Sequence, residues 1–567
     1  MEKNKGEERL PSDATPCRGC SVRLVAFLAL LFIATGSITS CATTPSTPTP
    51  AAATTPVAIS SQRDWSDAII YFVLIDRFAD GDGANNARVD RSNPGAWHGG
   101  DLPGLRAQLD EIAGLGATAI WINPVVKQID TPVWAQGPPG SEWARGFADG
   151  NEARAAGQGW PVGGFEHWPF HGYWADDFER LDPHFGAEAG LKALIEAAHA
   201  RGIKVLLDVV YNHVGYGARY VSAAPTRHWI RTHPGDCAVD PVTCQVGGLP
   251  DLRTELSEVR EHLFRAHLGL ARRVGLDGFR LDTVKHVEHD FWRAHRARTR
   301  AELGAEFFLL GEVWGGSNEV LDEWFAPDEM DAGFDFSFKG SCQSFVEGKG
   351  RTVAFAAYLA KRQRLRAGYH LAHYLSSHDE PMALHELGND VAKFKLCVAL
   401  QMTSFGIPVI YYGEEVGRRG GAWPTNRGDM PWGTRALPPG KDVGRDEVLR
   451  DYYRRLIAAR RAHPALTRGA FRALATDGDL LVFAREDGAA QDAVIVAINR
   501  GAQDATASVP LPAGWEAGAV REALSGARAD VRERMLSVNV PARTAHVYVH
   551  GAATSGTSAW PTFASSM

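Results

Sequence analysis

From residue 68 onward, short apolar runs typical of strands alternate with amphipathic stretches typical of helices. This alternation predicts an α/β fold in which helices cover a parallel sheet. Eight such units favour a closed TIM-type (β/α)8 barrel over an open sheet. The predicted strands are residues 69–75, 118–123, 204–210, 278–282, 307–312, 333–336, 373–377 and 408–412.

The barrel is predicted to carry helices on its outside and long loops at one end. Stretches 187–200 and 257–274 have apolar residues three and four positions apart, as covering helices do. Segments 125–169 and 214–252 are too long for simple connections, and loops of such length are often functional. We treat residues 214–256 as an inserted domain after the third strand.

The rest of the chain divides by composition. Residues 1–41 are predicted to be an export signal, 42–62 a Thr/Pro-rich tether, and 63–466 the barrel. Strand-like runs without intervening helices predict a C-terminal all-β sandwich domain over 467–551, and the Ser/Thr/Ala-rich tail 552–567 is predicted to be disordered.

The export signal has two readings. An apolar run at 24–33 follows basic residues and is too short for an ordinary spanning helix. The sequence Ile-Thr-Ser-Cys at 38–41 resembles a bacterial lipobox, which would make Cys41 a lipid anchor; an ordinary signal peptide is the alternative. Both predict an exported protein, periplasmic, extracellular or held at the surface, and Ala42 resembles outer-membrane sorting.

Charge and cysteines restrict the remaining possibilities. The net charge of −7, with Lys and Arg scattered, gives no basic stripe for nucleic acid and suits a neutral substrate; we expect a monomer. Cys237 and Cys244 share one loop and are predicted to pair in an exported protein. Cys342 and Cys397, in apolar surroundings, are predicted to be buried thiols.

Polar residues follow several predicted strands, where barrel enzymes place their active sites. Arg280 and Asp282 are two apart on the fourth strand and point to the same side, so the arginine keeps the carboxylate ionised, as a nucleophile requires. Glu312 ends the apolar fifth strand, where a raised pKa would suit a proton donor, and Asp379 ends the seventh. Each carboxylate alone could be a helix cap or an ion-pair partner.

Four motifs resemble those of the α-amylase family, glycoside hydrolase family 13. They are Asp208 to His213, Gly278 to His286, Gly311 to Trp314, and Ser377-His378-Asp379. The resemblance covers about residues 68–550. It implies that Asp282 is the nucleophile, Glu312 the general acid/base, and Asp379 the residue that holds sugar hydroxyls. The substrate-binding residues it implies are Tyr173, His171, Asp208, His213, Arg280, Lys285, His286 and His378.

The resemblance also implies calcium. Oxygen-rich residues packed with glycines suit a hard cation. The loop after the first strand resembles the calcium loop of cyclodextrin glycosyltransferases and related amylases, which implies the ligands Asp80, Asp82, Asn85, Asn86, Gly99 and Asp101. A second set would be Asn212, Asp251 and the backbone of His286, although the sequence around Asp251 is of the neopullulanase-like type.

The expected activity is cleavage of α-1,4-glucosidic bonds in starch, maltodextrins or related α-glucans, with retention. Thr283 resembles enzymes that cut α-1,4 bonds, whereas Ser377 replaces the family's usual Asn and leaves the substrate subclass open. The alternatives are a transglycosylase, an enzyme of the cyclomaltodextrinase or neopullulanase type acting on short or cyclic glucans, and a non-catalytic surface glucan-binding protein.

Overall fold

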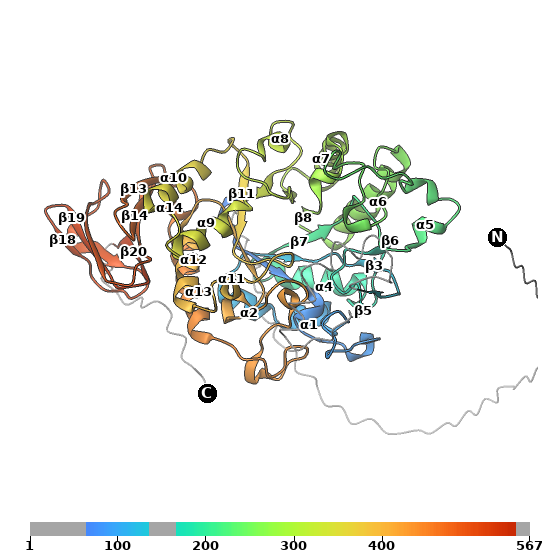
Figure 1. Cartoon of the computed structure of the whole chain (residues 1–567), viewed down its shortest axis with the longest axis horizontal. Coiled ribbons are helices and arrows are strands. Elements are labelled where there is room, and N and C mark those ends of the chain that lie inside the picture. The colour runs from blue at the N-terminus through green and yellow to red at the C-terminus, as the bar shows by residue number, and fades with distance from the viewer. Residues whose placement is uncertain (1–63, 135–165, 552–567) are drawn as a thin grey trace, which may run out of the picture. The chain divides into compact units, whose positions relative to one another are not determined.

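A closed barrel of eight parallel strands forms the centre of the protein (Figure 1). The computed structural model describes residues 64–134 and 166–551. In the barrel the strands follow one another in the order β1, β12, β11, β10, β9, β8, β7, β2. Their bounds are β1 Ile70–Val73, β2 Ala119–Ile122, β7 Lys204–Val209, β8 Gly278–Leu281, β9 Phe308–Gly311, β10 Ala332–Phe334, β11 His370–Tyr374 and β12 Ile407–Tyr411.

Each barrel strand overlaps a predicted run, which confirms the predicted (β/α)8 fold. Most boundaries differ by one or two residues, and the largest difference is at the seventh strand, which begins at His370 and not at residue 373. The N–H of His370 donates to the carbonyl of Asp331 at 2.9 Å, so the parallel ladder with β10 already begins there. Since helices cover the barrel and side chains fill it, most strand positions are buried and the strands are almost continuously apolar.

Helices surround the barrel (Figure 1). The longer ones are α1 Leu102–Ala107, α2 Leu109–Leu115, α4 Glu188–His199, α6 Ser257–Val274, α7 His289–Leu303, α9 Ser337–Val346, α10 Thr352–Arg362, α12 Val391–Thr403 and α13 Glu447–Ala462. The short ones are α5 Arg219–Ser222, α8 Asp322–Phe325, α11 Ala383–Glu386 and α14 Pro464–Thr467. Within the described ranges, none of these helices has the length and apolar character needed to cross a bilayer.

Two insertions extend the barrel's loops. Between β2 and α4, strand β3 Val126–Gln128 pairs with β6 Ala175–Leu181, and β4 Val133–Trp134 pairs with β5 Glu166–His167. After β7, residues 214–256 hold α5, short 3-10 turns and the disulfide Cys237–Cys244, which confirms the predicted pairing. An isolated bridge between His213, which follows β7, and Asp251 fastens this insertion to the barrel, and a second bridge, Ile230 to Leu252, lies within it.

Two antiparallel sheets follow the barrel. One contains β13 Ala470–Ala475, β14 Leu480–Asp487, β15 Asp492–Asn499, β20 Thr544–His550 and β17 Val520–Glu522; the other contains β16 Ala505–Pro510, β19 Met535–Val540 and β18 Asp530–Arg532. Alternate residues of β14 point to opposite faces: Leu481 and Phe483 join the barrel's core, whereas Leu480 and Val482 pack between the two sheets.

Buried arginines join the barrel to the first of these sheets. Arg485 of β14 donates to the carbonyls of Gly469 and Thr403 at 3.0 and 2.8 Å. Arg460 of α13 donates to Met402 and Ser404 at 2.9 and 3.0 Å. Their guanidinium groups thus donate hydrogen bonds to backbone carbonyls at helix ends, which lack a partner within the helix. The predicted thiols Cys342 and Cys397 are buried and free, as expected.

The predicted signal (1–41), tether (42–62) and tail (552–567) lie outside the described residues, as does part of the long loop after the second strand.

Candidate active site

A cavity of about 520 Å³ opens where the barrel strands end. It brings together the three predicted carboxylate positions, of which Asp282 follows β8, Glu312 follows β9, and Asp379 comes after β11. The cavity is lined by Val133, His167, His171, Tyr173, Trp174, Tyr216, Val246, Asp282, Thr283, Lys285, His286, Glu312, Trp314, His378, Asp379, Trp423 and Arg427. Such a large, mostly apolar hollow with a few convergent polar groups is typical of a small-molecule site.

Arg280 links three carboxylates in the floor of the cavity. The guanidinium is buried, and its Nη1 lies 3.0 Å from Asp208 and 2.6 Å from Asp282. Its Nη2 lies 2.6 Å from Oε1 of Glu312. Burial alone would lower the pKa of Arg280, but these carboxylates raise it well above its usual value. The arginine is therefore a permanent cation that keeps its neighbours close together.

Asp208 lies behind this group and is held by side chains from two other elements. Its Oδ2 accepts hydrogen bonds from Tyr173 at 2.7 Å and from the indole of Trp121 at 3.1 Å. Burial and the charge of Asp282 raise the pKa of Asp208 to about 7, against the opposing charge of Arg280. The contact with Asp208 fixes the ring of Tyr173 at the cavity wall.

Glu312 is suited to carry a proton. Its side chain is buried, and burial together with the charges of Asp282 and Asp379 raises its pKa to about 8, although Arg280 opposes this. The 2.6 Å ion pair with Arg280 shows that the same group is also stabilised when ionised. A carboxyl balanced in this way can both release and accept a proton near neutral pH.

Asp379 faces the cavity with 32% of its side chain exposed. Its oxygens contact Nε2 of His378 at 3.2 Å and Nη2 of Arg427 at 3.1 Å. Desolvation would raise the pKa of Asp379, but His378, Arg427 and Arg280 outweigh it and lower the pKa. Because burial lowers the pKa of His378 to about 3, the arginines are the lasting charges. Asp379 therefore presents an ionised carboxylate to a ligand.

The predicted histidines occupy different places. His378 stacks on Tyr173, with ring centroids 5.2 Å apart, and both line the cavity. His171 also lines the cavity, and its buried Nε2 has no hydrogen-bond partner among the described residues. His213 instead donates from Nε2 to the carbonyl of Tyr173 at 3.2 Å. It therefore supports Tyr173 from behind.

Lys285 and His286 lie on the 3-10 turn Val284–His286, just after Asp282 and Thr283, and both line the cavity. The Lys285 ammonium donates to the carbonyl of Trp314 at 3.4 Å. Burial lowers the pKa of His286. These side chains extend the cavity wall beyond the carboxylates.

Sequence reasoning missed Arg427, Trp423 and His167 as cavity residues. Arg427 anchors the loop after β12: it binds Asp379 and also donates from Nε to the carbonyl of His378 at 2.8 Å. Its position in the loop after the eighth strand was the available signal, since every such loop opens toward the same end of a barrel.

The predicted calcium loop gathers its oxygen donors. Asp80 is paired with Arg91 and with the amide of Asn86, at 2.7 and 2.8 Å. Asp101 accepts from the N–H groups of Asp82 and Gly104, the latter at 2.7 Å, and from the Asn85 amide at 3.0 Å.

Two oxygens of this loop stay unsatisfied within the protein. The Oδ1 atoms of Asn85 and Asn86 are buried without a partner among the described residues. At Gly99 a Cβ would lie 2.4 Å from Oδ1 of Asn86, so that only glycine fits. Buried unpaired amide oxygens beside carboxylates fit a hard cation.

The residues of the second predicted calcium site also lie close together. Placed with its nitrogen inward, the Asn212 amide donates to the carbonyl of His286 at 2.8 Å and to Asp251 at 3.2 Å. Arg231 lies 2.7 Å from Asp251 and supplies a positive charge. These residues can satisfy one another without a metal, so calcium here stays a prediction.

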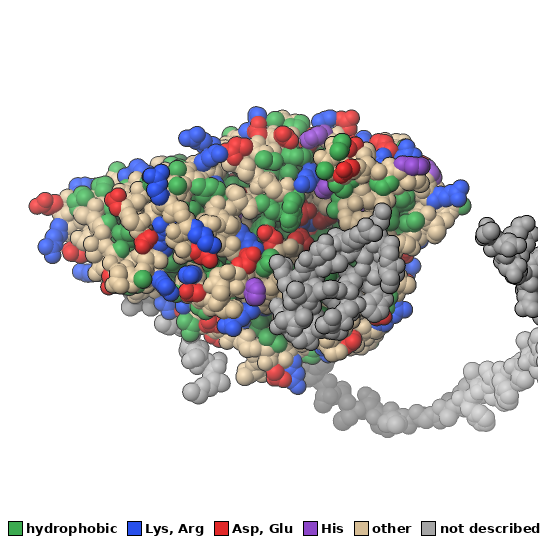
Figure 2. All heavy atoms as spheres, in the orientation of Figure 1, with side chains coloured by type: hydrophobic (Ala, Val, Ile, Leu, Met, Phe, Trp, Pro, Cys, Tyr) green, Lys and Arg blue, Asp and Glu red, His purple; other side chains and the backbone are tan. Residues whose placement is uncertain are grey.

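The visible face of the molecule mixes acidic and basic side chains without a continuous basic stripe, in keeping with a neutral ligand (Figure 2).

Comparisons with known proteins agree with this geometry. Residues 72–235 and 242–451 match the family described as "Alpha amylase, catalytic domain". A cyclomaltodextrinase from a Bacillus species is 30% identical over 473 residues, which cover 78% of this chain and 75% of that protein. The periplasmic α-amylase of Escherichia coli is 28% identical over 505 residues, 72% of this chain and 69% of that one. The solved structure of an α-amylase from Geobacillus thermoleovorans, complexed with acarbose, has a TM-score of 0.70 and 28% identity, covering 87% of this chain and 100% of that chain.

Proposed function

This chain belongs to the α-amylase family of glycoside hydrolases, which act on α-glucans, and we propose the residues by which it cleaves them. Asp282 attacks the anomeric carbon and forms a covalent glycosyl-enzyme. Glu312 first donates its proton to the departing glycosidic oxygen and then removes a proton from the water that releases the sugar. Asp379 and His378 bind hydroxyls of the sugar that stacks on Tyr173.

The observation that carries this proposal is the position of Arg280 between Asp282 and Glu312. While Asp282 is ionised, its charge helps to keep Glu312 protonated. Once Asp282 becomes an ester that charge disappears, the pKa of Glu312 falls, and Glu312 becomes able to act as the base. One constellation thus serves both steps of a retaining reaction.

The test measures reducing ends released from soluble starch by the wild type, Asp282→Asn and Glu312→Gln. We expect each substitution to lower kcat by at least about 10²-fold, the scale of acid–base catalysis. Full activity in both variants would refute the assignment. A wild type without activity on any α-glucan would instead favour the non-catalytic glucan-binding alternative, which the presence of all three carboxylates disfavours.

Cyclic and short glucans are the second candidate substrates, because a relative at 30% identity is named a cyclomaltodextrinase. Measuring kcat/KM on starch and on β-cyclodextrin in parallel shows which of the two substrate classes the protein prefers. Transfer to another sugar uses the same glycosyl-enzyme, so product analysis on maltooligosaccharides is needed as well. If longer or cyclic glucans are the main product, the activity of the protein is transglycosylation and not hydrolysis.

We also propose one calcium ion in the loop of Asp80, Asp82, Asn85, Asn86, Gly99 and Asp101. The two unpaired amide oxygens support it. The ion would hold the loop together and takes no part in the reaction steps above.

Export and lipid attachment at Cys41 are likewise proposals from the sequence. Fractionation of cells that produce the wild type or Cys41→Ser tests them: the wild type should sediment with membranes and the variant should not. Membrane-bound Cys41→Ser would contradict the anchor.

A further inference from the structure

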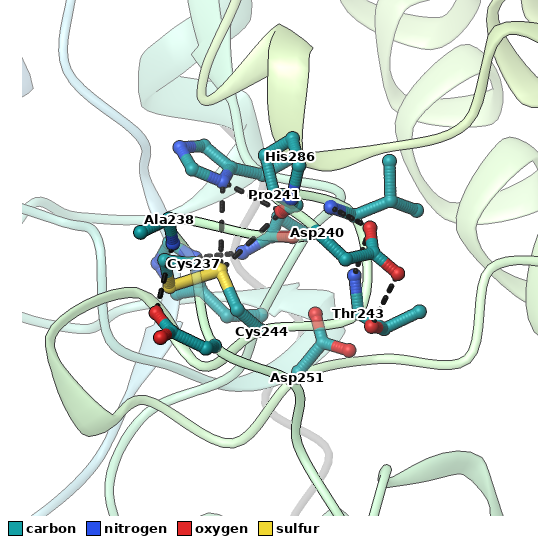
Figure 3. Close-up of a disulfide and its surroundings, with 12 residues drawn as sticks. Cys237, Ala238, Asp240, Pro241, Thr243, Cys244, Asp251 and His286 are labelled. Carbon is teal, nitrogen blue, oxygen red and sulfur yellow. Dashed lines mark hydrogen bonds between the residues drawn. A yellow bond between two sulfur atoms is a disulfide. The ribbon is translucent and has the colours of Figure 1, made fainter.

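A disulfide-closed loop lies against one of the cavity-lining histidines (Figure 3). We call residues 237–244 the disulfide loop, since Cys237 and Cys244 close it. Inside it, the Asp240 carboxylate accepts from the Thr243 hydroxyl at 2.7 Å and from the Val242 N–H at 2.9 Å. These short contacts shape the turn that carries Pro241.

The disulfide loop contacts Nδ1 of His286 at two points, since Sγ of Cys244 lies 3.9 Å from it and the carbonyl of Pro241 lies closer. Nδ1 of His286 lies 2.8 Å from the carbonyl oxygen of Pro241. A carbonyl can only accept, so the proton is on Nδ1 and the lone pair of the ring is on Nε2. Nε2 has no hydrogen-bond partner among the described residues, and His286 lines the cavity. The ring therefore offers an acceptor to a hydroxyl group.

The disulfide closes this loop, and backbone contacts such as the hydrogen bond from the Gly235 N–H to the carbonyl of Thr243 at 2.8 Å support it. Four of its eight residues are exposed, and among them Val239 is 82% exposed. Cys244 is buried whereas Cys237 is exposed, so the bond between them ties the exposed half of the loop to the buried half. A short loop without a core of its own depends on such a link for its conformation.

The position of His286 indicates which sugar it contacts. His286 ends the turn that starts after Thr283, and the Thr283 N–H binds Glu312 at 2.9 Å. Since Glu312 gives its proton to the departing oxygen, side chains on this turn flank the leaving sugar. Asp379 and Arg427, which bind each other, come from the loops after β11 and β12.

We propose that the disulfide loop is a positioning element for the leaving sugar, in which the Pro241 carbonyl fixes His286 so that Nε2 accepts a hydrogen bond from a glucosyl hydroxyl. This inference rests on the proposed function and adds to it a specificity device outside the carboxylate group.

The test compares two substrates. Maltoheptaose places a sugar on the leaving side, whereas release of nitrophenol from 4-nitrophenyl α-maltotrioside does not. We expect Cys237→Ser to lower kcat/KM for maltoheptaose about 5- to 10-fold, the value of one hydrogen bond, with little change in nitrophenol release. The matched control is Val239→Ser in the same loop, which should change neither rate. Equal losses on both substrates, or no loss on either, would overturn the proposal.

A double-mutant cycle supplies the second readout. His286→Phe keeps the ring and removes the acceptor, so it should reproduce the loss on maltoheptaose, and adding Cys237→Ser should cost nothing more. Additive losses would show that the loop does not act through His286. If Cys237→Ser does not fold, reduction and alkylation of the folded wild type replaces it. A wild type inactive on every α-glucan would instead refute the proposed function itself.

Discussion

The backbone N–H of Thr283 donates a hydrogen bond to Oε2 of Glu312 at 2.9 Å. It can do so because Thr283 has a φ of 48°, in the left-handed region that β-branched residues rarely adopt. The residue that follows Asp282 is thereby tied to Glu312, so backbone geometry helps to set the spacing of these two carboxyl groups. Backbone strain of this kind concentrates at functional sites.

The pH dependence of catalysis should follow the protonation of Glu312. Burial and the charges of Asp282 and Asp379 raise its pKa to about 8. Because the proton donor must be protonated in the free enzyme, kcat/KM should fall as the pH rises through this value. Asp379→Asn removes one negative neighbour, so the basic limb should move to lower pH, by about one unit.

The control for this profile is Asp110→Asn, an exposed carboxylate that pairs with Arg201. The basic limb of its pH profile should coincide with that of the wild type. Profiles of kcat/KM between pH 5 and 10 decide the matter, and an unmoved limb in Asp379→Asn would show that its charge does not act on Glu312.

Arg427 should matter for substrate binding although no sequence motif marked it. It holds Asp379 through Nη2 and the carbonyl of His378 through Nε. Arg427→Met should lower kcat/KM on starch by about 10²-fold, because the sugar-binding carboxylate loses its fixed position. Arg419→Met, an exposed arginine of the same loop, should leave kcat/KM unchanged. Equal values of kcat/KM for the two variants would show that Arg427 does not contribute to substrate binding.

The sequence predicted the barrel and its carboxylates for a physical reason. Each barrel strand is buried on both sides, so it appears as an apolar run, and functional residues follow directly where the run stops. Arg427 and Trp423 lie in an irregular loop, where no periodicity exists to place a side chain. The support of Tyr173 by His213 depends on a contact between different elements, which local pattern does not contain.

The C-terminal sheets illustrate the same limit. The apolar runs 480–485, 493–499 and 545–549, which the sequence predicts as strands, correspond to β14, β15 and β20, which are long and mostly buried. Strand β16 was missed, since Ala505–Pro510 alternates small and polar residues and is largely exposed. Such edge strands are defined by their neighbours more than by their own composition.

Glu414 should make stability depend on pH. It is buried in the 3-10 turn Glu414–Val416 just after β12, and burial raises its pKa to about 8, with Glu415 adding to the shift. The folded protein therefore binds this proton more tightly than the unfolded chain does. The free energy of unfolding should fall through this group as the pH rises from its ordinary value of 4.5 to 8.

Glu414→Gln removes that dependence. Urea unfolding should show a gain of about 2–3 kcal/mol over the wild type at pH 8 and almost none at pH 4.5. Glu306→Gln, at an exposed position, should give no gain at either pH. A Gln variant that is no more stable at pH 8 would mean that Glu414 is ionised in the folded state without penalty.

Arg485 should be a main support of the junction between the barrel and the C-terminal sheets. It is fully buried and donates to carbonyls of Gly469, Thr403 and Leu466. Arg485→Met leaves these acceptors unpaired and should lower the free energy of unfolding by about 3–5 kcal/mol. Arg468→Met, which removes an exposed ion pair with Asp67, should cost at most about 1 kcal/mol. Similar costs in urea unfolding would contradict this role.

Calcium removal should destabilise the protein through the loop of Asn85 and Asn86. Their amide oxygens have no hydrogen-bond partner among the described residues, and a bound cation would supply one. At a free concentration of about 100 times its Kd, such an ion stabilises the folded state by about 2.7 kcal/mol, so chelation should lower the thermal midpoint by several degrees. Asn86→Ala should start from the lower midpoint and lose its response to added calcium, whereas Asp90→Ala, outside the ligand set, should keep it. A wild type whose midpoint is the same with calcium and with chelator has no calcium at this loop, and the unpaired oxygens would then need another partner.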